Sequence, residues 1–280
     1  MLNNYKETVK NRITKIRFLR NLTLKHFRRF DGRLRIYLTL QCNLRCVYCV
    51  NQCFEGTESR ISEYSLSSAE KWISAINREK RHIVITGGEP TLHPEFIEIL
   101  NGIDQRLEVM VYTNFKWSES FLERFLSQAR RTPIFYGSYH PSSGDPRNFI
   151  HILKTLRRNG RFRGSLHAID SKQNDVVLMK AVSRIESEGF GIKLDQDQSA
   201  LFHCACRRFR KSVECIKQII LIAPDGYRYP CVSKMVRRKN TLENIFTEPL
   251  GPEKVSTICG DYGYCAPCDG IGSVKFNVLK

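Results

Sequence analysis

The sequence predicts an α/β fold in which a partial barrel of six strand–helix repeats precedes a small cysteine-rich domain. Between residues 33 and 200, short apolar runs alternate with longer segments whose apolar residues recur at helical spacing. After residue 200 this alternation stops and cysteines become frequent. Alternating strands and helices are typical of a parallel sheet. Six strands are too few for a closed eight-stranded barrel, so we expect an open, partial one.

These changes divide the chain into three predicted parts. Residues 1–32 form a basic N-terminal segment, residues 33–200 the barrel and residues 201–280 the C-terminal domain. In the N-terminal segment, apolar residues recur at helical spacing between Lys and Arg. We expect a helix that packs on the barrel, and contact with a peptide, a nucleic acid or a membrane surface is the alternative.

Each predicted strand is a short run rich in apolar, β-branched and aromatic residues. The strands are Leu34–Leu40, His82–Thr86, Leu107–Thr113, Ile134–Tyr139, Phe162–Ala168 and Phe190–Leu194. The helices lie near Ser67–Arg78, Pro94–Gly102, Ser118–Arg130, Pro146–Arg158 and Lys172–Glu188. Ser67 and Ser118 are suitable N-cap residues because their hydroxyl groups can accept the first free amide hydrogens.

Composition and charge narrow the class of protein. With 41% hydrophobic residues, the 280-residue chain can form a sizeable core. It has no run of 18 apolar residues and no apolar region of a secretory signal, so we expect a cytoplasmic protein without a membrane span. Eleven cysteines in such a chain indicate metal binding rather than a disulfide scaffold. The net charge is +17, of which residues 1–30 and 201–240 carry +8 each. The barrel is therefore nearly neutral.

The segment Leu38–Gln52 contains the first cysteine motif. Cys42, Cys46 and Cys49 are spaced C-x3-C-x2-C directly after the first predicted strand. Three thiolates on one loop can hold three irons of a cubane cluster, which usually takes four cysteine ligands. The fourth iron is then open for a substrate or cofactor. A structural zinc site, with Cys53 as fourth ligand, is the alternative.

A glycine-rich motif follows the second predicted strand. Its residues are Thr86, Gly87, Gly88, Glu89 and Pro90. Paired glycines let the backbone approach a ligand closely. In barrels of parallel strands, functional residues gather at the carboxyl ends of the strands. This rule places the motif near the cysteine loop, together with polar residues from the ends of later strands: Asn114, Ser138, His140, Asp170 and Asp195.

The CNL segment, the tyrosine before the third cysteine and the GGEP motif one strand later together resemble the radical S-adenosylmethionine (SAM) superfamily. The resemblance implies a (β/α)6 TIM-like barrel and a [4Fe-4S] cluster on Cys42, Cys46 and Cys49. It also implies that SAM binds the open iron through its amino and carboxylate groups. An external electron donor, such as a flavodoxin or ferredoxin, would reduce the cluster. SAM would then yield a 5′-deoxyadenosyl radical that abstracts a hydrogen atom from the substrate.

The same resemblance suggests roles for the polar residues. The GGEP motif would lie beside the amino group of SAM. Ser138 would contact its ribose, and Asn114 would approach the methionine carboxylate or the substrate. His140 would hydrogen-bond or protonate the substrate, with a packing or capping role as the alternative. Asp170 and Asp195 are weaker candidates, because acidic residues often end strands for solubility.

The C-terminal domain contains a second cysteine set. Cys215 and Cys231 are spaced C-x10-G-x4-C around Gly226. We expect this glycine to turn a hairpin between Ile219–Ala223 and Tyr227–Tyr229. With Cys265 and Cys268, the four thiolates suit a fully ligated iron–sulfur cluster, and zinc is the alternative.

The second set resembles the C-terminal extensions called SPASM and twitch domains, which hold two and one auxiliary clusters. A SPASM domain would continue with C-x2-C-x5-C-x3-C, whereas this chain shows Cys259-x5-Cys265-x2-Cys268. The departure favours the twitch type with one auxiliary [4Fe-4S] cluster. Cys204, Cys206 and Cys259 remain, and a second auxiliary cluster that uses them is the alternative. Cys53 has no role beyond the zinc alternative.

We therefore expect a radical SAM enzyme of the oxidoreductase type, which dehydrogenates, epimerises or cross-links its substrate at an unactivated C–H bond. A small anionic metabolite, such as a sugar or cyclitol derivative, suits the neutral barrel with its polar strand ends. Maturation of a ribosomally made peptide is the alternative, although the residues before the first strand are too few for a leader-binding domain. Nucleic-acid modification, suggested by the net charge, and a non-enzymatic metal-binding protein are further alternatives.

Overall fold

The computed structural model describes residues 32–46, 48–49, 61–170, 175–196, 211–217, 220–252, 254–262 and 275–278. The helix predicted in residues 1–30 lies outside them. So do the predicted ligands Cys265 and Cys268 and the unassigned cysteines Cys53, Cys204 and Cys206.

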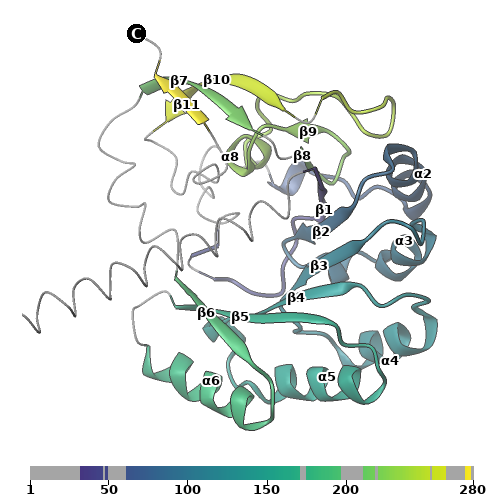
Figure 1. The fold of residues 1–280 in the computed structure, drawn as a ribbon, viewed down its shortest axis with the longest axis vertical. Helices are drawn as coiled ribbons and strands as arrows, with labels where there is room; N and C mark the ends of the chain where they lie inside the picture. Colours follow the sequence, from purple (N-terminus) through teal and green to yellow (C-terminus); the bar gives the residue numbers. More distant parts are fainter. Residues whose placement is uncertain are drawn as a thin grey trace, which may run out of the picture.

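An eight-stranded sheet forms the centre of the described structure (Figure 1). Its strands are β1 (Leu34–Thr39), β2 (Ile83–Gly87), β3 (Val109–Thr113), β4 (Ile134–Tyr139), β5 (Gly164–Asp170), β6 (Ile192–Gln196), β8 (Ile220–Ile222) and β9 (Arg228–Tyr229). They lie in the order β6-β5-β4-β3-β2-β1-β8-β9. The pairs from β6 to β8 are parallel, and β9 runs antiparallel to β8. This mostly parallel sheet confirms the predicted α/β partial barrel.

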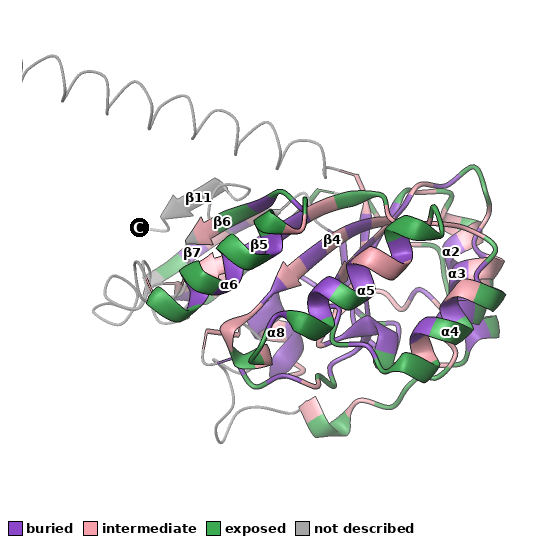
Figure 2. Ribbon diagram, turned by 90° about the horizontal axis from the view of Figure 1, so that it is seen from below, coloured by how far each residue is buried: buried purple, intermediate pink, exposed green. Residues whose placement is uncertain are grey.

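The five predicted helices connect successive strands from β1 to β6. They are α2 (Ala69–Glu79), α3 (Phe96–Gly102), α4 (Glu119–Gln128), α5 (Arg147–Arg158) and α6 (Val176–Ser187). Figure 1 shows them along the outer side of the sheet. In α5, Phe149, Ile152, Leu153 and Leu156 form one buried stripe at spacings of three and four residues. Such stripes pack against the strands and form the core, while Figure 2 shows exposed residues on the opposite side of α4, α5 and α6.

Several predicted boundaries differ from the structure. The strands β5 and β6 each begin two residues later than expected, because the apolar residues Phe162 and Phe190 pack on the core before their strands start. Ser118 caps α4 as predicted, since its hydroxyl accepts from the amide of Phe121 (3.2 Å). The assignment of Ser67 as the cap of α2 was wrong: Ser68 precedes the helix, and the Ser67 hydroxyl donates to the carbonyl of Pro224 (3.0 Å).

The sheet has two different faces. On β3, β4 and β5, the residues Val111, Phe135 and Leu166 are buried in the core between the sheet and the helices. Side chains alternate along a strand, so their neighbours point to the inside of the partial barrel. That inner face carries polar residues: Tyr112, Tyr136, Ser138 and His167.

The segment after residue 210 contributes to two sheets. The predicted hairpin is confirmed as β8 and β9, with Gly226 at φ +84° in its turn. It joins the main sheet, because β8 pairs in parallel with β1. A second sheet has the order β10-β7-β11, from Val255–Tyr262, Lys211–Lys217 and Lys275–Val278. A short helix, α8 (Val232–Val236), follows β9. The three-part division of the chain stays a prediction, and the main sheet includes strands from both sides of its boundary at residue 200.

No described helix is both long enough and apolar enough to span a membrane. The expected cytoplasmic location stays a prediction.

Candidate functional site

The glycine motif packs directly against the start of the cysteine loop. Gly88 donates its amide hydrogen to the carbonyl of Thr39 (2.9 Å), and Glu89 donates to that of Gln41 (2.8 Å). A Cβ atom on Gly87 would lie 2.1 Å from the Thr39 oxygen, and one on Gly88 would lie 2.1 Å from the Gln41 oxygen. Because these are fixed backbone atoms, glycine is required at both positions. The contact holds the two motifs side by side at the carboxyl ends of β1 and β2.

Glu89 is buried and serves as an internal anchor for this end of the barrel. Its Oε1 atom accepts from the amide and hydroxyl of Thr91 and from the hydroxyl of Thr113. Its Oε2 atom accepts from the amide of Asn114 (2.8 Å). Burial raises the pKa of Glu89, although these four donors oppose the rise. The side chain thus connects the motif to the end of β3.

Asn114 joins the end of β3 to the cysteine loop. Its amide nitrogen donates to the side-chain oxygen of Asn43 (2.8 Å) and lies 3.9 Å from the sulfur of Cys42. Its amide oxygen accepts from the amide of Lys116 (2.8 Å). Asn43 in turn donates to the carbonyl of Lys116 (2.7 Å). Sequence reasoning did not assign Asn43 a role, although it lies within the motif, directly after Cys42.

The end of β4 holds the other side of the loop. Tyr48 and His140 stack with their ring centroids 5.8 Å apart, and the tyrosine hydroxyl lies 2.9 Å from Nδ1 of His140. Burial lowers the pKa of His140 to about 4, so the ring is neutral at pH 7 and can accept from Tyr48. Ser142, which the sequence placed at the end of this strand without a role, has its hydroxyl 3.0 Å from the sulfur of Cys46. Ser138 is half-buried on the inner face, opposite His167 of β5.

These contacts fit an iron–sulfur cluster with three protein ligands. The Cys42, Cys46 and Cys49 thiols lie on one loop, and polar groups of Asn114 and Ser142 approach two of the sulfurs. Such outer hydrogen bonds orient and tune metal ligands. Among the described residues, no three Cys, His, Asp or Glu side chains converge on a single metal ion. A cubane cluster does not need that arrangement, because its ligands bind separate irons.

The family is shown by comparison. A model of the radical SAM superfamily matches residues 36–182, which is more than half of the chain. The chain belongs to the radical SAM superfamily. In this superfamily the [4Fe-4S] cluster and SAM are the shared cofactors, as the cysteine loop predicted.

Relatives and solved structures extend this comparison. Over 175 residues, the chain is 31% identical to "GTP 3′,8-cyclase" of Haemophilus influenzae, covering 59% of this chain and 50% of that protein. Over 81 residues, it is 37% identical to "Probable GTP 3′,8-cyclase" of Methanocella arvoryzae, covering 29% and 26%. The chain thus spans half or less of these relatives. The structure "Native anSMEcpe with bound AdoMet" shares the fold, with a TM-score of 0.51, 14% identity, and 78% and 79% coverage of this chain and of that one.

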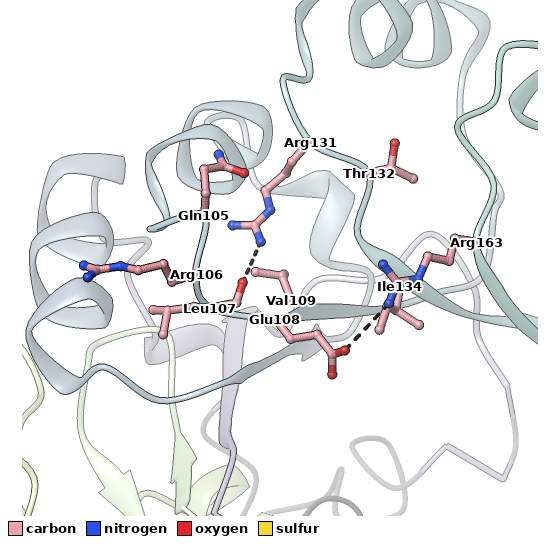
Figure 3. A pocket seen from close by; sticks show the side chains of 9 residues that line it. All are labelled: Gln105, Arg106, Leu107, Glu108, Val109, Arg131, Thr132, Ile134 and Arg163. Carbon is pink, nitrogen blue, oxygen red and sulfur yellow. Dashed lines mark hydrogen bonds and ion pairs between the residues drawn. The ribbon is translucent and has the colours of Figure 1, made fainter.

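A cavity of about 240 Å³ opens at the other end of the sheet, beside the starts of β3 and β4 (Figure 3). Three arginines line it, and each already has a protein partner: Arg106 pairs with Asp104, Arg131 donates to the carbonyl of Leu107, and Arg163 lies 3.7 Å from Glu108. Functional residues of parallel barrels lie at the carboxyl ends of the strands. We therefore do not assign the reaction to this cavity.

Two cysteines of the second set, Cys215 and Cys231, lie in described residues, and so does the unassigned Cys259. Cys215 in β7 is opposite Thr257 in β10, so Cys259, two residues further, shares its face of the sheet. Cys231 precedes α8 and accepts from the amide of Lys234 (3.4 Å). Burial lowers the pKa of Lys234. The hydrogen bond and charge of Asp261, together with the smaller influences of Cys259 and Cys231, raise it above its ordinary value. Cys231 and Cys259 are therefore both near the Lys234 ammonium group.

Proposed function

We propose that this chain is a radical SAM enzyme that acts on an unactivated C–H bond of a small anionic metabolite. When bound and reduced, the cluster and SAM would supply a 5′-deoxyadenosyl radical for hydrogen abstraction. The observation that carries the proposal is the contact of Gly87 and Gly88 with the start of the cysteine loop. It leaves no room for a Cβ atom and holds the motif against the start of the loop that carries the three thiols.

The residues of the site have distinct proposed tasks. Cys42, Cys46 and Cys49 would ligate the cluster, and the backbone of the GGEP motif would bind the amino group of SAM. Ser138 would contact the ribose from the inner face of β4. Asn114 would approach the methionine carboxylate while it fixes the loop through Asn43. Because its Nδ1 faces Tyr48, His140 would position the loop and offer only Nε2 to a substrate.

The anionic character of the substrate is supported by Arg35. This residue alternates with Leu34 and Ile36, which belong to the core, and so lies on the inner face of β1. Burial raises the pKa of the inner-face Tyr112, and the charge of Arg35 is the largest influence that lowers it. No described residue forms an ion pair with Arg35. The relatives' name, GTP 3′,8-cyclase, makes a nucleoside triphosphate the first anionic substrate to test.

The test is SAM cleavage by anaerobically reconstituted protein. Replacing Cys42, Cys46 and Cys49 together by alanine should abolish 5′-deoxyadenosine formation, measured by liquid chromatography under reducing conditions. An external flavodoxin or ferredoxin, as the proposed donor partner, should replace chemical reductant for the wild-type protein. If the triple variant forms 5′-deoxyadenosine at the wild-type rate, the proposed function is wrong.

We further propose an auxiliary [4Fe-4S] cluster of the twitch type on Cys215, Cys231, Cys265 and Cys268. It would accept the electron left after hydrogen abstraction, or bind the substrate. Removing the four cysteines should lower the iron content by about four per chain. Cys259, which like Cys231 influences the Lys234 ammonium group, provides the matched control: Cys259→Ala should leave the iron content unchanged. Unchanged iron in the quadruple variant would exclude these ligands, and zinc in the purified protein would favour a structural zinc site.

A further inference from the structure

A row of aromatic side chains crosses the inner face of the sheet. Tyr112 of β3 and Tyr136 of β4 stack with centroids 4.4 Å apart and an interplanar angle of 18°. Tyr136 also stacks on His167 of β5, with centroids 3.8 Å apart and an angle of 16°. Three strands therefore contribute stacked rings to the inner side of the sheet.

Asp195 of β6 ends this row and is held by two donors. Its Oδ2 atom accepts from the Tyr136 hydroxyl (3.0 Å) and lies 2.8 Å from Nδ1 of His167. On the far side of the ring, the Ser165 hydroxyl is 3.0 Å from Nε2 of His167. An ionised carboxylate can only accept, so His167 directs an N–H from Nδ1 toward Asp195. The position of this carboxylate is thus fixed by the surrounding side chains.

The second oxygen of Asp195 is available to a ligand. No hydrogen bond from a described residue reaches Oδ1, and the side chain is 41% exposed. Burial raises the pKa of Asp195, but hydrogen bonds and charge from His167, the Tyr136 hydroxyl and Lys193 lower it overall. The group therefore stays ionised near neutral pH.

The row also lies within reach of the cysteine loop. On β4, Tyr136, Ser138 and His140 follow one another on the inner face, and His140 contacts Tyr48 of the loop. A strand rises about 3.3 Å per residue, so Tyr136 is about 13 Å below His140. A small molecule beside Ser138 can span this distance, with one end near the loop and the other at Asp195.

We propose that Asp195, held by Tyr136 and His167, is a substrate-recognition carboxylate that binds an amino group of the small anionic substrate. This inference rests on the proposed function and adds to it the chemical class of the substrate. An N–H donor suits the site because a charge-assisted hydrogen bond to a carboxylate is stronger than a neutral one. Arg35, on the inner face of β1, is the counterpart for the anionic part of the same molecule.

The experiment compares ligand pairs that differ at one amino group. The probes are GTP with ITP, which lacks the 2-amino group of guanine, and glucosamine 6-phosphate with glucose 6-phosphate, which has a hydroxyl in place of the amine. Dissociation constants would be measured by calorimetry on anaerobically reconstituted protein with SAM. In at least one pair, the wild-type protein should bind the amino member about tenfold more tightly, as expected for a hydrogen bond to a charged group.

The ratio of the two dissociation constants within a pair distinguishes a loss of amino-group recognition from damage to the fold, because general damage weakens the binding of both ligands alike. Asp195→Ala should bring the ratio to about one, and Tyr136→Phe, which keeps the ring, should lower it several-fold. Asp170→Ala, at the end of the neighbouring strand β5, is the matched control and should keep the ratio. The proposal is overturned if wild-type protein prefers the amino member in neither pair, or if Asp195→Ala keeps the preference. SAM cleavage by wild-type protein without added substrate is measured separately, so failure of the radical chemistry is distinguishable from failure of this inference.

Discussion

Gly88→Ala is the sharpest single test of how the two motifs are held together. The new Cβ atom would lie 2.1 Å from the carbonyl oxygen of Gln41 and 2.7 Å from that of Leu40. Carbon and oxygen do not approach below about 3 Å, so the GGEP motif must move away from the cysteine loop by about 1 Å. Overpacking of this kind costs about 1–3 kcal/mol. The movement also lengthens the hydrogen bonds from Gly88 and Glu89 to the end of β1.

The assay has two readouts. In thermal unfolding, a loss of 1 kcal/mol lowers Tm by roughly 2–4 °C for a domain of 150–250 residues, so a decrease of roughly 2–12 °C is expected. In SAM binding, the affinity should fall, because the backbone proposed to meet the amino group has moved. Gly191→Ala is the matched control: a Cβ atom there meets nothing within 4 Å, and its φ lies outside the left-handed region. If Gly88→Ala matches Gly191→Ala in both Tm and SAM affinity, the steric argument is wrong.

Two further predictions concern buried titratable groups. Glu89→Gln keeps the shape of the side chain but turns an amide NH2 toward a backbone or hydroxyl donor. It should therefore lower the free energy of unfolding by about 1–3 kcal/mol in urea titrations; equal stability would show that the four donors do not need the carboxylate. His140 has a pKa of about 4 in the folded protein against 6.5 as its ordinary value. Between these two pKa values the unfolded chain therefore binds more protons than the folded protein. The contribution of neutral His140 to folding stability is present above pH 6.5 and is lost as pH falls toward 4. Between pH 8 and pH 5, wild-type protein should lose up to about 2 kcal/mol that His140→Asn does not lose, and parallel pH curves for the two proteins would contradict the assignment.

Much of the fold follows from local patterns in the sequence. Strand β4 has the predicted bounds, and helix α4 has the predicted cap at Ser118. The predicted hairpin around Gly226 is present because the turn chemistry is local. The cysteine loop and the GGEP motif follow neighbouring strands, so sequence alone could place them at one end of a parallel sheet. Boundaries were less predictable where an apolar residue before a strand, such as Phe162 or Phe190, packs on the core without pairing.

Contacts between distant segments were decided by the tertiary structure. The sequence shows that Ile220–Ile222 is an apolar run, but not that it pairs with β1, because a strand's neighbours depend on how the whole sheet assembles. The two faces of β1 are also indistinct in the sequence, since all but one of its residues are buried. Burial on both faces removes the alternation that would mark an inner and an outer side.

The inner face of the sheet shows the same difference between what the sequence determines and what the tertiary structure decides. The sequence by itself determined the cysteine triad, the glycine motif and the order of strands and helices, because each rests on residues close together in the chain. It identified Asp195 only as an acid at the end of a strand. The structure joined it to Tyr136 and His167, which lie 59 and 28 residues away. Parallel pairing brings equivalent positions of neighbouring strands together, and the helices on the outer side leave the polar residues facing inward.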